Sequence, residues 1–171
     1  MKKVKQYNNL ILSISWLLSE ARNKVIRQVN SILTQTYWYI WKQIVEYELW
    51  KNMKKNYWNQ LLKKIAQDLK SEFGRGFSWR NLYYMKLFYS TYWKLQTLSA
   101  KFEKLTWSHF VELLSITNNN ERSFYEIECI ENNRSVRELS RQINSALYER
   151  LALSNNKSWV KQLAKKWQIL Q

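Results

Sequence analysis

The sequence contains no proline, two glycines, one cysteine and one histidine among 171 residues. All-β proteins depend on glycine and proline at their many turns, so this scarcity favours helices joined by short polar connections. A lone cysteine cannot form a disulfide within the chain, and one cysteine with one histidine cannot supply a zinc-type site. We therefore expect an all-α protein in a reducing compartment, the cytoplasm, with no metal or other cofactor.

Acidic residues are also few, since 13 Asp and Glu stand against 28 Lys and Arg and give a net charge of +15. Residues 1–110 hold 19 basic and 6 acidic residues, whereas residues 111–171 hold 9 and 7. A field of this sign attracts polyanions, of which nucleic acid and anionic membrane surfaces are the usual ones. The alternative is that the lysines form an ordinary solvated surface and are frequent because the genome is rich in A and T. No apolar run is long enough to span a bilayer. Of the two polyanions we expect nucleic acid as the partner, and no membrane.

Hydrophobic residues make up 46% of the chain and aromatic residues 16%, which indicates a packed core. Apolar residues at steps of three and four predict a short helix at about 7–18 that packs back on a long helix from Glu20 to Tyr47. The predicted buried stripe of the long helix comprises Val25, Val29, Ile32, Leu33, Tyr37, Ile40, Ile44 and Tyr47. A third helix follows and ends at Phe73, with a stripe of Trp58, Leu61, Leu62, Ile65, Leu69 and Phe73.

The only glycines flank Arg75, where both are expected to form a tight turn, because glycine adopts left-handed backbone angles without a Cβ penalty. Ser78 can then cap a fourth helix. The predicted buried side of that helix carries Leu82, Met85, Phe88 and Tyr92. A helix, a short glycine turn and a second helix give the helix-turn-helix outline.

A second unit of this shape follows. Thr106 can cap a helix that runs to Ile116, an Asn-rich loop at 118–120 precedes a helix over 121–131, and Ser135 with Glu138 forms a capping box for a helix to Leu151. Residues 157–170 predict a short basic amphipathic helix. We expect an all-α helical bundle of about seven helices, forming one domain over 1–171. Residues 1–104 would hold the long-helix hairpin and first unit, and residues 105–171 the second unit and C-terminal helix.

Two turns carry the candidate DNA-binding residues. The second helix of a helix-turn-helix enters the major groove, where Arg can bond guanine, Asn can bond adenine and Ser suits a phosphate. At the first turn we expect DNA contacts from Arg75, Ser78, Arg80, Asn81 and Tyr84, with Arg80 and Asn81 exposed, and backbone contacts from Lys63, Lys64 and Lys86. The second surface would comprise Arg134, Ser135, Arg137 and Arg141 at a helix start, which favours phosphate. The alternative is that the serines only cap their helices and the charged residues are solvated.

Catalytic residues are not evident. Ser108 and His109 lie within one helical turn, without a partner acid or oxyanion site nearby, so a structural role is expected for them. Glu126, Glu128 and Glu131 are interpreted as solvated acids on a helix rather than as a metal site. We therefore predict no catalytic and no metal-binding residue.

Several motifs occur in a specific order: Tyr37-Trp38, Gly74 to Ser78 with Asn81-Leu82, Leu105 to His109, Glu121 to Tyr125, and Ser135 to Leu139 continuing to Tyr148-Glu149-Arg150. With them the chain resembles the N-terminal domain of the YhcG family of predicted PD-(D/E)XK nucleases, from about residue 7 to residue 170. In that family a C-terminal α/β domain bears the catalytic carboxylates and lysine, and this chain ends before one.

The resemblance implies a DNA-targeting module of a nuclease-type protein that does not itself cut. The expected partner is double-stranded DNA, with structured DNA left open. The alternative function is a helical protein-interaction or dimerisation module, and a homo-oligomer formed through the long helix is kept open as well.

Four positions depart from the family pattern: Arg134 stands where the family has Trp, and Trp41, Trp58 and Trp167 stand where it has Gly. An indole cannot take the place of a turn glycine. We hypothesise that a codon read as glycine by the host is written here as tryptophan, and the codons at these positions test it.

Overall fold

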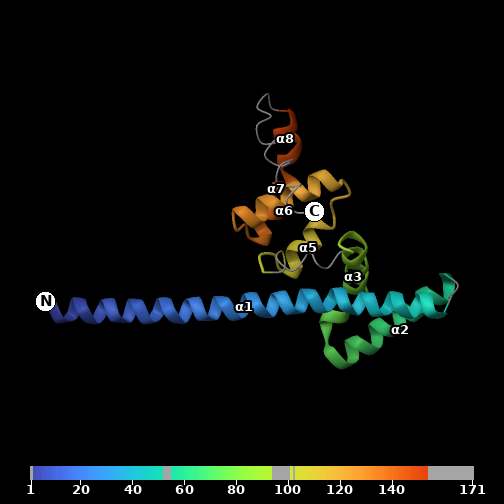
Figure 1. Cartoon of the computed structure of the whole chain (residues 1–171), viewed down its shortest axis with the longest axis horizontal. Coiled ribbons are helices and arrows are strands. Elements are labelled where there is room, and N and C mark those ends of the chain that lie inside the picture. The colour runs from blue at the N-terminus through green and yellow to red at the C-terminus, as the bar shows by residue number, and fades with distance from the viewer. Residues whose placement is uncertain (1, 52–54, 94–100, 102, 154–171) are drawn as a thin grey trace.

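The computed structural model describes residues 2–51, 55–93, 101 and 103–153, and in these ranges the backbone forms seven α-helices, one 3₁₀ helix and no strand. The expected all-α fold is confirmed (Figure 1). In chain order the elements are α1 (Lys2–Lys51), α2 (Lys55–Phe73), η1 (Arg75–Phe77), α3 (Trp79–Thr91), α5 (Trp107–Leu113), α6 (Asn119–Glu131), α7 (Val136–Asn144) and α8 (Leu147–Leu153).

Helix α1 is a single helix of 50 residues, roughly 75 Å long at 1.5 Å per residue. The prediction of a separate helix over 7–18 that packs back on it is wrong, because Ser19-Glu20-Ala21 contains no residue that breaks a helix. All of residues 6–29 are exposed, and the expected burial is also wrong for Val25, Val29, Ile32, Leu33 and Tyr47. Among the described residues, those of α1 that are buried by other helices begin at Thr34.

The first hydrophobic core lies where α1 meets α2 and α3. Its buried members are Tyr37, Trp41, Ile44, Ala66, Leu82 and Met85. Figure 1 shows α2 on one side of α1, α5 to α8 on the other, and α3 close to α1. The burial expected for Leu82, Met85 and Phe88 is confirmed, whereas Phe73, predicted to be buried, is 60% exposed.

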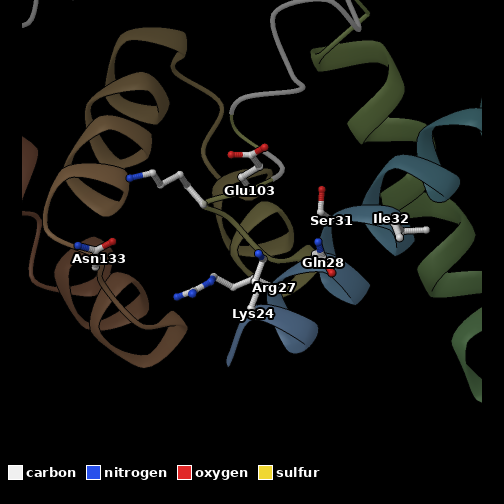
Figure 2. A pocket seen from close by; sticks show the side chains of 8 residues that line it. Lys24, Arg27, Gln28, Ser31, Ile32, Glu103 and Asn133 are labelled. Carbon is white, nitrogen blue, oxygen red and sulfur yellow. The ribbon is translucent and has the colours of Figure 1, made fainter. Parts of the chain in front are cut away.

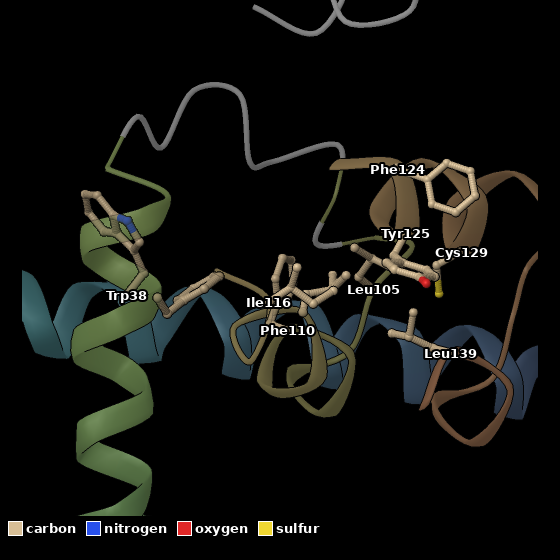
Figure 3. Packing of buried hydrophobic residues seen from close by; sticks show 10 residues of the cluster. Trp38, Leu105, Phe110, Ile116, Phe124, Tyr125, Cys129 and Leu139 are labelled. Atoms are coloured by element: carbon tan, nitrogen blue, oxygen red, sulfur yellow. The ribbon is translucent and has the colours of Figure 1, made fainter. Parts of the chain in front are cut away.

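The second core joins α1 and α3 to helices α5, α6 and α7, and Figure 3 shows its packing. Its buried members are Trp38, Phe88, Leu105, Phe110, Leu113, Ile116, Phe124, Tyr125, Cys129 and Leu139. The Trp38 indole N–H donates to the Tyr92 carbonyl at 2.8 Å and ties α1 to the end of α3. Trp107 and Tyr89 pack against both cores, so the two form one continuous interior.

Helices α7 and α8 are separate, so the prediction of one helix from residue 136 to residue 151 is wrong. Ala146 has a φ of +51°, which an α-helix cannot contain. The Tyr125 hydroxyl occupies the break, where it donates to the Gln142 carbonyl at 3.3 Å and accepts from the Tyr148 N–H at 3.2 Å. Buried Tyr125 thus satisfies backbone groups that the break leaves without helical partners. The helix expected over 157–170 lies outside the described residues.

Candidate nucleic-acid interface

The glycine turn between α2 and α3 depends on one glycine rather than two. Gly74 has a φ of +86° and its N–H donates to the Lys70 carbonyl at 3.0 Å, which ends α2. Gly76 has no positive φ, and a Cβ there would meet the Tyr37 hydroxyl at 3.6 Å, an ordinary contact. The expectation that both glycines supply left-handed angles is therefore wrong for Gly76.

Ser78 and Asn81 hold this turn together. Ser78 caps α3 as predicted, since its Oγ accepts from the Asn81 N–H at 3.3 Å. The Asn81 side chain, half-buried, donates through Nδ2 to the Gly76 carbonyl and accepts through Oδ1 from the Trp107 indole N–H at 2.9 Å. The expectation of an exposed Asn81 is wrong, because its amide is used to join the turn to α5.

The cations expected at this first unit are exposed. Lys63, Lys64, Arg75, Arg80 and Lys86 all reach solvent, and none forms an ion pair with the part of the chain that the structure describes. Tyr84, the remaining candidate on α3, is half-buried. The described acids therefore hold none of these five cations in an ion pair, although Asp68 and Glu72 also lie on α2.

Two aromatic residues beside Arg80 were missed from the sequence. The rings of Trp79 and Tyr83 stack on the outside of α3, 6.2 Å apart between centroids and 15° from parallel. They are 53% and 47% exposed, respectively. The signal in the sequence was their spacing of four, which places both on one side of a helix, away from buried Leu82. Exposed rings next to cations are a surface on which nucleic-acid bases can stack.

The second predicted surface is only partly available. The Arg134 guanidinium contacts Glu128 at 2.9 Å, and the Arg134 carbonyl accepts from the His109 ring at 3.0 Å. Ser135 and Glu138 form the predicted capping box, in which the Ser135 N–H donates to the carboxylate at 2.8 Å. That bond lowers the pKa of Glu138.

Arg137 and Arg141, on the outside of α7, are exposed and form no ion pair with the described residues. In Figure 1 this surface lies on the opposite side of α1 from α2, so the structure does not bring the two predicted surfaces together.

A basic cleft of about 810 Å³ was also missed from the sequence (Figure 2). Its charged lining comprises Lys24 and Arg27 from α1 with Glu103 and Lys104 from the segment before α5. Asn133, which precedes Arg134, closes the far wall, so the cleft borders the second surface. Its residues come from three distant segments, and no sequence pattern connects them.

The remaining candidates for chemistry are structural. His109 is buried, its Nδ1 accepts from the Thr106 N–H at 3.1 Å and its Nε2 faces the Arg134 carbonyl, so both ring nitrogens have partners. Burial lowers the pKa of His109. Burial also raises the pKa of the Cys129 thiol to about 11, which keeps it protonated at neutral pH.

The expectation of solvated acids on α6 is wrong for Glu126. This residue is buried, accepts from the Tyr92 hydroxyl at 3.0 Å and forms an ion pair with Lys101. Burial, and after it the Glu126 charge, raises the pKa of Tyr92 well above its ordinary value. The cause of the error is distance in sequence, since Tyr92 lies 34 residues before its partner. Glu128 is also half-buried against Arg134, while Glu131 is exposed.

In the described part of the chain no three His, Cys, Asp or Glu residues lie together where they could hold a metal ion. The described helices include none that is both long and apolar enough to cross a membrane.

Comparison with known proteins places these features in a family. The model of the "DUF1016 N-terminal domain" matches residues 13–150. The chain is 36% identical over 181 aligned positions to a protein of Escherichia coli (strain K12) named "Putative nuclease YhcG", a match that covers 89% of this chain and 48% of that protein. The chain thus spans about half the length of this curated relative, and no solved structure matches it. The chain belongs to the DUF1016 N-terminal domain family, the YhcG-type domain that its motifs resemble.

Proposed function

We propose that this chain binds nucleic acid, double-stranded DNA first, as the targeting module of a nuclease-type protein. The observation that carries the proposal is a set of seven exposed cations that lack an acidic partner among the described residues: Lys63, Lys64, Arg75, Arg80, Lys86, Arg137 and Arg141. Unneutralised cations repel one another and destabilise a compact protein, whereas they gain free energy next to phosphates. The name of the Escherichia coli relative, "Putative nuclease YhcG", agrees with such a partner.

The residues at the first turn have three proposed roles: contact with the groove, contact with the phosphate backbone, and support of the turn. Arg75 and Arg80 reach solvent at the turn and would contact the groove, with Trp79 and Tyr83 available for unstacked bases of structured DNA. Lys63, Lys64 and Lys86 would contact the phosphate backbone. Ser78 and Asn81 would act indirectly, because their polar atoms hold the turn that presents the arginines.

On the other side of α1, the second surface would act through Arg137 and Arg141. Ser135 and Arg134 would set the start of α7 rather than bind directly. Lys24 and Lys104 in the adjoining cleft would extend the path of the DNA backbone, whereas Arg27 there forms an ion pair with Glu20 at 3.1 Å.

A salt titration of three variants tests the division. Each phosphate contact contributes about 0.9 to the slope of log affinity against log salt. Changing Lys63, Lys64 and Lys86 together to Gln should flatten this slope by roughly two to three and weaken binding to every duplex alike. Lys161, Lys165 and Lys166 changed to Gln provide a control of equal charge.

The third variant carries Arg137→Gln and Arg141→Gln. If it flattens the slope while the first leaves it unchanged, the second unit is the binding surface and the first turn is not. An unchanged slope in all three variants contradicts both assignments.

We propose further that cutting belongs to the part of such proteins beyond this domain, since 52% of the relative's length lies outside the match. Supercoiled plasmid incubated with this chain and Mg²⁺ or Mn²⁺ should stay uncut. Metal-dependent nicking that copurifies with the chain would contradict this. The cytoplasmic location expected from the sequence stays a prediction.

A further inference from the structure

The first half of α1 presents apolar side chains to solvent on a scale unusual for a folded protein. Residues 6–19 contain no charged residue, and Leu10, Leu12, Trp16, Leu17 and Leu18 are each 55–68% exposed. In proteins most of the stability of a helix comes from packing of an apolar face, and residues 6–29 of α1 are all exposed. A partner must therefore cover it, and its sequence indicates which one.

Eight positions of α1 follow a heptad pattern, with alternating steps of four and three. They are Tyr7, Ile11, Ile14, Leu18, Ala21, Val25, Gln28 and Ile32, and we call this row the seam. Its six large apolar members are 42–64% exposed. A repeat of 3.5 residues is what two helices need to stay in contact while they supercoil.

Most of the seam lies opposite the surface of α1 that packs on the other helices, and only its last two members, Gln28 and Ile32, also line the cleft with Glu103, Lys104 and Asn133. Residues of α1 advance by about 100° each, which places the seam opposite the buried set of Thr34, Tyr37, Trp38, Trp41 and Ile44. Further along the same face, Thr36, Tyr39, Gln43 and Glu46 are exposed. A second helix can therefore lie along the seam from Tyr7 to Val25 without meeting α2, α3 or α5, and beyond Val25 it passes the rim of the cleft.

From this placement we propose that two copies of the chain associate in parallel and in register through their α1 seams, as a two-stranded coiled coil. Ile11, Val25 and Ile32 occupy heptad position a together with Leu18, and β-branched residues at position a are typical of parallel two-stranded coiled coils. Gln28 within the seam helps to fix the register.

The flanking residues permit this pairing. In register, Lys24 of one copy faces Val29 of the second, and Arg22 faces Leu17, so like charges do not meet. Leu10 and Leu17 widen the apolar strip. Burial of such side chains removes on the order of 100 Å² each, so the strip supplies roughly 800 Å² per copy, the size of a stable interface.

A membrane surface is the main competing partner, and the charge pattern disfavours it. Helices that lie in a membrane interface carry one strongly charged face opposite the apolar one. Residues 6–19 have no charge on any face. The coiled coil also does not depend on nucleic-acid binding, although it would give the proposed DNA-binding surfaces two-fold symmetry.

Light scattering after gel filtration of the full chain tests the proposal. The expected mass is twice the 21.0 kDa of one chain. Ile14→Glu with Leu18→Glu should reduce it to that of one chain. Leu12→Glu with Trp16→Glu is the matched control, since these apolar side chains lie on the face opposite the seam and are more exposed than Ile14 and Leu18, and it should leave the dimer intact.

The parallel orientation of the two α1 helices is tested separately with Val25→Cys under oxidising conditions. Parallel pairing brings the two introduced thiols together and yields a covalent dimer, whereas the parent, with only buried Cys129, yields none. A parent mass of one chain, a control variant that dissociates like the seam variant, or no cross-link at position 25 would each overturn the proposal. Binding of the chain as a monomer to anionic phospholipid vesicles would assign the apolar face to a membrane instead.

Discussion

A variant that removes the hydrogen bond between Asn81 and Trp107 tests whether Asn81 stabilises the first turn or binds DNA directly. Asn81→Ala removes the acceptor of the Trp107 indole N–H and the donor to the Gly76 carbonyl. A buried donor left without a partner costs about 1–3 kcal/mol. The Gly76 carbonyl is exposed and can bond to water in the variant. We therefore expect the free energy of unfolding to fall by about 1–2 kcal/mol, mostly because the indole N–H is left without an acceptor. For a chain of this length that lowers Tm by about 2–4 °C per kcal/mol.

Arg80→Ala is the matched control one residue earlier. Its side chain is exposed and unpaired with the described residues, so stability should change by less than about 0.5 kcal/mol, while the salt slope of DNA binding flattens by about one. Calorimetry and the salt titration would be run on both variants. Trp107→Phe removes the indole N–H. The loss of stability in the double variant should therefore be smaller than the sum of the losses in Trp107→Phe and Asn81→Ala. An Asn81→Ala variant with unchanged Tm, or additive losses in the double variant, would refute the bridging role.

The remaining predictions concern four other places. Because burial lowers the pKa of His109, its contribution to the free energy of unfolding should be complete above pH 6.5 and should be lost as the pH falls below that value. Denaturant titrations should show this loss in the unaltered chain and not in His109→Gln. Trp41 is 2% exposed, so Trp41→Gly should cost about 3–5 kcal/mol in thermal or denaturant unfolding, and a variant as stable as the parent would support a glycine codon. Ala146→Gly relieves the positive φ and should raise stability by up to about 1 kcal/mol by calorimetry. Trp79→Ala with Tyr83→Ala should weaken binding to single-stranded DNA more than to duplex in fluorescence anisotropy, and an equal loss on both would exclude stacking.

Local signals in the sequence predicted the helix starts well. Ser78 and the Ser135–Glu138 pair cap α3 and α7 as expected, because a cap depends on atoms only three residues apart. The end of α2 at Gly74 was predicted for the same reason.

What the sequence did not predict depends on contacts between distant segments. The break before Leu147 is stabilised by the hydroxyl of Tyr125, and the burial of Glu126 depends on Tyr92 and Lys101. Asn81 was predicted to be exposed and to contact the DNA groove, because the group that donates to its side-chain oxygen, the Trp107 indole N–H, lies 26 residues away in the sequence.

The same limit applies to the candidate site. The exposure of most predicted cations followed from their place on the polar faces of helices. The cleft beside Asn133 could not be predicted, because α1, the segment before α5 and the α6–α7 connection meet there only in the folded chain.

The most direct test of the proposed function is the affinity of the unaltered chain for a random-sequence DNA duplex, measured by fluorescence anisotropy between 50 and 200 mM salt, the range over which phosphate contacts dominate. With seven exposed cations available, we predict a linear fall of log affinity against log salt with a slope of about −4 or steeper. No binding at the lowest salt, or an affinity that does not change with salt, would contradict the account.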